Sequence, residues 1–224
     1  MKKLLLPLPL VLLTFGFVAN NVFAGDRVIL GSLERLTEEY DDPYVSVSLE
    51  SAVNGFSAKF YRFQSYGLYT GLDLVRMTGD IDVCFQSNPS NCSQVDVKVT
   101  MFSAEFGWAL GRWIPFVGRT FSQTTGEETG IALIDSENRF GVNPSSVVER
   151  TADKGGRNIG LWIERDTFKV KGALKSVDGN EPMSVSGGVL FQMDNKFAVG
   201  AEFEIQLDSE AEGFRFSLQF GRSF

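Results

Sequence analysis

The sequence contains no histidine. The charged side chains that remain for acid–base chemistry are the carboxylates of Asp and Glu and the cations of Lys and Arg. Histidine is the commonest general base and a common metal ligand. Its absence excludes zinc sites of the histidine type and nucleophiles activated by a histidine. A mechanism based on carboxylates alone stays open, but no motif indicates one. We therefore expect a protein that is not an enzyme and that has no catalytic residues, no cofactor and no metal site.

The chain has two cysteines, Cys84 and Cys92, which lie close together in the sequence. A redox pair would favour a tighter motif than this spacing. If the chain is exported through an oxidising compartment, the spacing predicts a local structural disulfide. Such a bond would restrain a surface hairpin.

Charged side chains recur at every second position, with apolar residues between them. Lys169 and Lys171 show this pattern, and so do Glu202 and Glu204. Alternation of this kind is typical of a β-strand with one polar and one apolar face. The same assignment along the chain gives a polar face that carries Glu50, Lys59, Asp73, Glu105, Glu164, Lys169, Lys171, Glu202, Glu204 and Arg215.

The elements that must position these charges are strands, because period-two alternation repeats along the chain with turn residues between the segments. Their lengths, near ten residues, are those of tilted membrane strands. We predict an all-β fold, a closed antiparallel up-and-down transmembrane β-barrel of about ten strands, with eight to twelve possible. The predicted spans are 43–51, 56–65, 67–78, 95–110, 114–124, 156–165, 167–176, 183–193, 197–207 and 212–224.

In a membrane barrel the apolar face contacts lipid and the polar face fills the lumen. Mixed charges in a narrow lumen predict a paired network that plugs the barrel, since buried charges need partners. A polar conduit for small solutes or ions is the alternative. Tyr66, Tyr69, Trp108, Trp113 and Phe116 cluster near short turns, where an aromatic girdle is expected.

The connections between the predicted strands are unequal. Very short turns occupy every second junction, and the long loops, 79–94 and 125–155, fall at the others. This is the asymmetry of outer-membrane barrels. The long loops predict a surface for an unknown extracellular partner, although loop 125–155 could equally be a mobile lid. Arg150, Lys154 and Arg157 are candidate contacts for lipopolysaccharide phosphates, or simply a solvated run of charge.

The first 24 residues predict a cleaved signal peptide. Met1-Lys2-Lys3 is followed by an apolar run, and the segment ends in a small-x-Ala pattern at Ala24. Residues 25–42 precede the predicted barrel at 43–224. We interpret them as a periplasmic N-terminal lead or a short amphipathic helix.

The end of the chain carries a recognisable pattern. Phe224 is preceded at two-residue steps by Phe220 and Leu218, although Arg222 departs from the apolar residue usual at its place. This resembles the terminal signal of Gram-negative outer-membrane barrels, and the stretch 113–118 resembles a strand opening of small OmpA-like barrels. The resemblance implies the outer membrane as location, the barrel-assembly machinery as a partner during biogenesis, and lipid and lipopolysaccharide as surroundings. It implies no particular activity, since this fold hosts many.

The leading hypothesis is therefore a non-enzymatic integral outer-membrane barrel with a structural, adhesive or partner-binding role. A narrow pore is the alternative, and a soluble periplasmic lipocalin-like barrel that binds an apolar ligand is a further one. The net charge of −7 and the lack of a basic tract argue against nucleic acid as a partner.

Overall fold

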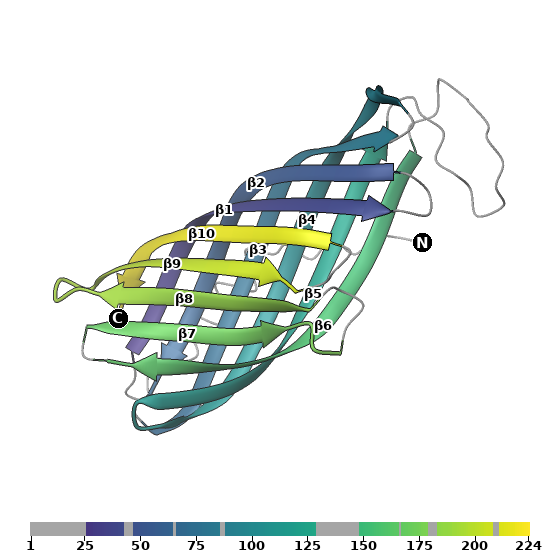
Figure 1. The fold of residues 1–224 in the computed structure, drawn as a ribbon. Helices are drawn as coiled ribbons and strands as arrows, with labels where there is room; N and C mark the ends of the chain where they lie inside the picture. The colour runs from purple at the N-terminus through teal and green to yellow at the C-terminus, as the bar shows by residue number, and fades with distance from the viewer. Residues whose placement is uncertain are drawn as a thin grey trace, which may run out of the picture.

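The computed structural model describes residues 26–42, 47–64, 66–85, 88–128, 148–165, 167–178, 183–207 and 211–224. Within these ranges the chain forms ten antiparallel strands that close into one barrel (Figure 1). Each strand pairs with the next along the chain, and β10 pairs with β1 to close the sheet. The predicted fold class is thus confirmed. The strands are β1 (Asp26–Asp42), β2 (Val47–Phe63), β3 (Tyr66–Phe85), β4 (Asn88–Leu110), β5 (Trp113–Glu128), β6 (Val148–Glu164), β7 (Phe168–Lys175), β8 (Ser184–Gln192), β9 (Phe197–Gln206) and β10 (Ala211–Ser223).

Strict alternation determines which side chains face outward. On β10, Phe216, Leu218 and Phe220 are exposed, whereas Ser217 and Gln219 are buried in the lumen. Successive side chains of a strand point to opposite faces of the sheet, so the sequence pattern passes directly into the structure. The apolar face is the outside of the barrel, which is the arrangement that lipid requires and a soluble barrel avoids.

The interpretation of residues 25–42 as a lead or a short helix is wrong, because residues 26–42 form β1, which pairs with both β10 and β2. The error has a physical reason. The inward face of β1 carries Val28 and Leu30 as well as Ser32 and Glu34, so its hydrophobic pattern does not alternate cleanly. A barrel without this strand would expose two unpaired sheet edges, which a membrane does not tolerate.

The two predicted strands 43–51 and 56–65 are parts of the single strand β2, so the predicted junction between them does not exist. The gain of β1 and this merger leave the strand number at ten. The predicted loop 79–94 is also wrong, because β3 continues to Phe85 and β4 begins at Asn88. For loop 125–155, β5 reaches Glu128 and β6 begins at Val148. Residues 129–147 and the predicted signal peptide lie outside the described residues, so those predictions stay predictions.

Two ends of the barrel are distinguished by their connections. The short-turn end holds the connections at 64–65, 111–112, 165–167 and 193–196, together with the start of β1 and the end of β10. The loop end holds the other five connections. Both ends of the described barrel sequence lie at the short-turn end, as an even strand number requires.

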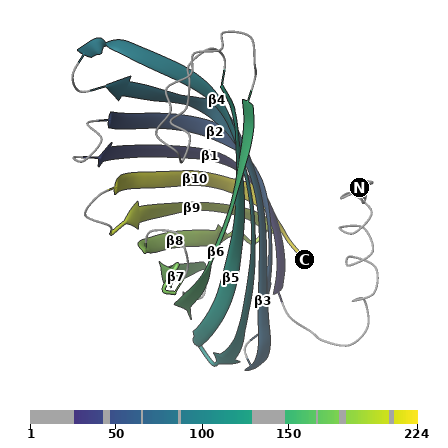
Figure 2. The same ribbon diagram turned by 90° about the vertical axis from the view of Figure 1, so that its right-hand side faces the viewer.

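The barrel wall is tall on one side and low on the other. β3 and β4 have 20 and 23 residues, whereas β7, β8 and β9 have 8, 9 and 10. A membrane strand needs about 9–11 residues, so β3 and β4 are about twice that length, whereas β7 to β9 are close to it (Figures 1 and 2). Among the described residues, no helix has the length and apolarity to span a bilayer.

Candidate functional site: the barrel lumen

Aromatic side chains fill the lumen near the short-turn end. Tyr61, Phe63, Tyr69, Phe116 and Trp162 point inward from four strands and are almost fully buried. Their ring centroids lie 5.3–5.8 Å apart, mostly in tilted or edge-to-face arrangements. Such contacts are favourable for aromatic pairs. We call these five residues the aromatic plug.

Trp162 and Tyr69 of the aromatic plug are hydrogen-bonded, and they join the plug to the charges on its loop side. Trp162 donates a hydrogen bond from Nε1 to the Tyr69 hydroxyl at 2.8 Å. Tyr69 in turn donates to Oε2 of Glu105 at 2.7 Å. A buried indole or phenol is costly without a partner, so this chain of bonds fixes the orientation of both rings.

The plug was not recognised from the sequence as a unit. Tyr66, Trp108 and Trp113 are exposed on the outer wall, where a girdle requires them, but the girdle prediction is wrong for Tyr69 and Phe116, which are buried in the lumen. Position parity could have separated them, since Tyr66 and Tyr69 stand three residues apart on β3 and therefore face opposite sides.

On the loop side of the aromatic plug, charged side chains from seven strands meet in the lumen. Lys59 is the most enclosed of the cations, and its Nζ lies 3.0 Å from Glu202, 3.2 Å from Asp73 and 3.7 Å from Glu34. Five carboxylates and four cations contact one another in this way. We call this set the central ion network, and its members are Glu34, Lys59, Asp73, Glu105, Lys171, Lys175, Glu202, Glu204 and Arg215.

The closest contacts of the network also have hydrogen-bond geometry. Lys171 donates to Glu105 at 2.6 Å and Lys175 donates to Glu204 at 2.7 Å. Arg215 donates from Nε to Glu34 at 3.1 Å. Burial penalises every charge here, and close opposite charges with hydrogen bonds are what offset that penalty.

The structure places most of the predicted lumen charges together. Asp73, Glu105, Lys171, Glu202, Glu204 and Arg215 belong to the central ion network. Glu164 and Lys169 pair with each other nearer the short-turn end, where Asp26 lies 3.8 Å from Lys169.

Glu50 does not join the central ion network. It is exposed on the outward face of β2, opposite Glu39 and Asp82. The prediction failed because residues 43–51 were treated as a separate strand, which disconnected Glu50 from the parity of Lys59. Because β2 is one continuous strand, its odd-numbered residues, such as Lys59, face inward and its even-numbered residues, such as Glu50, face outward.

Two network members were missed by the sequence prediction. Glu34 lies on β1, which was not recognised as a strand. Lys175 stands on β7 in step with Lys169 and Lys171, so parity alone would have placed it in the lumen.

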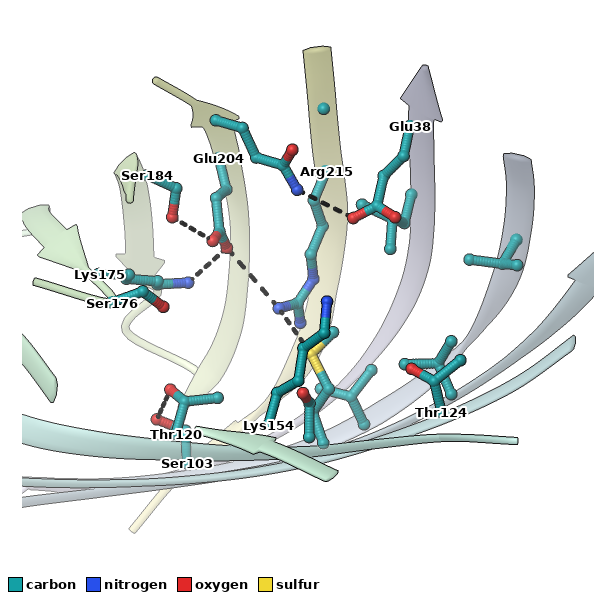
Figure 3. Close-up of a pocket in the computed structure, with 18 of the residues that line it drawn as sticks. Glu38, Ser103, Thr120, Thr124, Lys154, Lys175, Ser176, Ser184, Glu204 and Arg215 are labelled. Atoms are coloured by element: carbon teal, nitrogen blue, oxygen red, sulfur yellow. Dashed lines mark hydrogen bonds and ion pairs between the residues drawn. The ribbon is translucent and has the colours of Figure 1, made fainter. Parts of the chain in front are cut away.

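A cavity of about 170 Å³ lies between the central ion network and the loop end. Leu36, Val53, Val75, Val99 and Met101 form an apolar side of its lining. In Figure 3, Thr120, Ser103, Ser184 and Lys175 line other parts of the cavity, and Glu204 and Arg215 form an ion pair between the neighbouring strands β9 and β10. The lumen is thus filled at the short-turn end and hollow towards the loop end.

The candidate lipopolysaccharide contacts do not share one surface. Arg157 points outward, is exposed and pairs with Asp178 at 2.8 Å. Lys154 instead lines the cavity (Figure 3), so its prediction as an outer contact is wrong. The side chain of Arg150 lies outside the described residues. Lys154 and Arg157 stand at an even and an odd position of the same strand, β6, so their side chains face opposite sides of the wall.

The terminal residues Leu218, Phe220 and Phe224 are all exposed on the outer wall.

The sheet register sets Cys84 opposite Cys92. Facing Cα atoms of antiparallel strands are about 4.5–5.5 Å apart, a separation that a disulfide can bridge. Their side chains lie outside the description, so the disulfide stays a prediction. Among the described residues, no group of three His, Cys, Asp or Glu side chains is arranged to hold a metal ion.

Comparison with known proteins identifies the fold class. The chain is similar to the translocator domain of the autotransporter NalP from Neisseria meningitidis, with a TM-score of 0.51, 10% identity, and coverage of 96% of this chain and 94% of that chain. It is also similar to Ail, the attachment invasion locus protein of Yersinia pestis, with a TM-score of 0.48, 11% identity, and coverage of 90% and 100%.

No protein-family model and no curated protein matches the chain. The structural neighbours are barrels of the Gram-negative outer-membrane type, and the chain shares their fold. At identities this low the likeness establishes the fold and nothing about activity.

Proposed function

We propose that this chain is a non-enzymatic integral barrel of the outer membrane that does not conduct solutes, with a structural or partner-binding role. The observation that carries the proposal is the filled lumen. The aromatic plug and the central ion network stack above one another inside a ten-strand barrel, a size only slightly wider than one that side chains fill. Without histidine, the chain also lacks the usual general base of hydrolytic enzymes.

The outer wall supports membrane insertion against the soluble alternative. Phenylalanines such as Phe56, Phe106 and Phe220 are exposed at 70%, 55% and 52%. Large exposed apolar surfaces of this kind mark contact with lipid or protein. A lipocalin-like barrel would instead carry its apolar face inside, where this protein has charges. Release from the membrane fraction without detergent would contradict insertion.

The surface available to a partner is the part of β2 to β5 that continues past the membrane. Its outward residues Asp80, Asp82 and Asp96 are exposed carboxylates. This charge favours a partner with a basic surface. The barrel-assembly machinery would act on the opposite side of the protein, through the terminal strand.

Planar-bilayer conductance tests the closed lumen. We expect no discrete channels from the wild type. Replacing two plug residues together, Phe63→Ala and Trp162→Ala, removes large side chains from the lumen and should produce small channels. The matched control is Trp108→Ala, which removes an exposed indole from the outer wall and should leave the barrel closed. Reproducible wild-type channels that change when Lys171 is replaced would support the pore alternative instead.

A further inference from the structure

Two arginines stand directly opposite each other on the outer wall. The register pairs Arg119 of β5 with Arg157 of β6, and both side chains are exposed. Like charges in such a cross-strand pair repel each other. Asp178 pairs with Arg157, but no described residue forms an ion pair with Arg119, whose guanidinium lies over the Phe121 ring at 4.8 Å. The group therefore keeps one net positive charge.

The pair is embedded in the lipid-facing surface. Along β5 its neighbours on the same face are Val117 and Phe121, and along β6 the next outward residue is Ile159, all three exposed. Arginine on the lipid face of a barrel is unfavourable, and less so near the interface. An anionic partner would relieve both this cost and the mutual repulsion of the two guanidinium groups.

The height of the pair on the wall indicates which lipid can reach it. Arg119 follows Trp113, the first residue of β5, by six positions. Six residues span about 20 Å along a strand, or about 15 Å of height at the usual barrel tilt. An apolar band is about 25 Å tall, so the pair lies in the half nearer the loop end. In outer-membrane barrels the longer loops are extracellular, and that half faces the outer leaflet.

On the side where headgroups lie, no charged side chain among the described residues of β6 stands directly next to the pair. The outward position next to Arg157 towards the loop end is Gly155, which the register pairs with Phe121. A Cβ at this glycine would lie 3.1 Å from the carbonyl oxygen of Thr120. Such a Cβ would also lie 3.7 Å from Cδ1 of Phe121, so the ring that carries the Arg119 guanidinium packs beside this glycine.

We propose that Arg119 and Arg157 together clamp a phosphate group of an outer-leaflet lipid, the lipid A part of lipopolysaccharide. Two planar guanidinium groups on one face suit the bidentate recognition of phosphate. The inference rests on the proposed outer-membrane placement, and it replaces Lys154 by Arg119 as the neighbour of Arg157 in lipid binding.

The test uses the purified barrel in detergent, with lipid A that carries both phosphates as the probe and native mass spectrometry to measure bound lipid. Arg119→Gln and Arg157→Gln should each weaken binding by about tenfold, as expected for loss of a charge-assisted hydrogen bond. The double variant should lose less than the product of both effects, because the two groups share one phosphate. The matched control is Arg76→Gln, an exposed arginine of the outer face of β3, which should bind lipid A as the wild type does.

Two further arms separate the sources of phosphate. Lipid A without phosphates should bind the wild type no better than it binds the double variant, and millimolar inorganic phosphate should not displace intact lipid A. Equal binding by wild type and clamp variants, an equal loss in Arg76→Gln, or displacement by inorganic phosphate would each overturn the proposal. Arg119→Lys, which keeps the charge, serves if the glutamine variant fails to fold. A barrel that extracts only with detergent yet binds no lipid A would refute the clamp while leaving the proposed membrane placement intact.

Discussion

Replacement of Lys59 by methionine should destabilise the barrel strongly. Its Nζ is the only cation within 4 Å of Glu34, Asp73 and Glu202 at the same time among the described residues, at 3.7, 3.2 and 3.0 Å, and its side chain is 1% exposed. Methionine keeps the length of the buried stem but leaves these carboxylates without their shared partner.

The magnitude follows from the charge balance of the central ion network. Its four cations face five carboxylates, which gives a net charge of −1. Loss of Lys59 changes this net charge to −2 in a buried space. Breaking a buried ion pair from one side typically costs about 3–5 kcal/mol. We expect the free energy of unfolding to fall by about that amount.

The assay is urea unfolding of the barrel from lipid vesicles, followed by tryptophan fluorescence. Lys154→Met is the control, since Lys154 is an exposed lysine at the cavity, and its effect should stay within about 0.5 kcal/mol. Adding Asp73→Asn to the Lys59 variant should recover part of the loss by restoring the charge balance. A loss below about 1 kcal/mol for Lys59→Met, with an unchanged denaturant slope, would refute the reasoning and indicate that water screens these charges.

Two further predictions concern the ends of the wall. Deleting Phe224, an exposed residue at the end of the terminal strand, should impair assembly into the outer membrane, and heat-modifiable electrophoresis would show less folded barrel; normal folding of this variant would count against the terminal signal. At the loop end, Asp80 faces Asp96 across β3 and β4, and the hydrogen bond with Asp96 raises the pKa of Asp80, with local desolvation and the charges of Asp96 and Asp82 acting in the same direction. A raised pKa means that the folded hairpin is favoured while Asp80 holds its proton and loses that advantage as pH rises through the folded-state value. Asp80→Asn should therefore slow hydrogen exchange of the β3–β4 amides at neutral pH and leave it unchanged in acid. Equal slowing of exchange at both pH values would contradict the ionisation of Asp80 as the cause.

The lumen shows where sequence reasoning succeeds and where it stops. Lys169, Lys171, Glu202 and Glu204 could be assigned to the polar face because each stands in a strand with clean alternation, and a strand has only two faces. Which of these charges meet was not predictable, since Lys59 and Glu202 are far apart in the chain and become neighbours only when the barrel closes.

The failures share a physical cause. On β1 and the second half of β2, apolar residues face both the lumen and the outside, as Val28 and Ile29 do on β1. Hydrophobicity then no longer reports orientation, and strand ends, register and parity are lost together. The aromatic plug was missed for the same reason, because Phe63 and Phe116 look like lipid-facing residues when their position in the register is unknown.

The sequence by itself determined the fold class, the polar and apolar faces of most strands, and the absence of histidine chemistry, because these depend on composition and on a local period of two residues. The tertiary structure alone decided that β1 closes the barrel and that Arg119 faces Arg157 on the outer wall. It also decided that the lumen is filled at the short-turn end and hollow towards the loop end. These features depend on inter-strand register and on closure, which bring together residues that no local pattern connects.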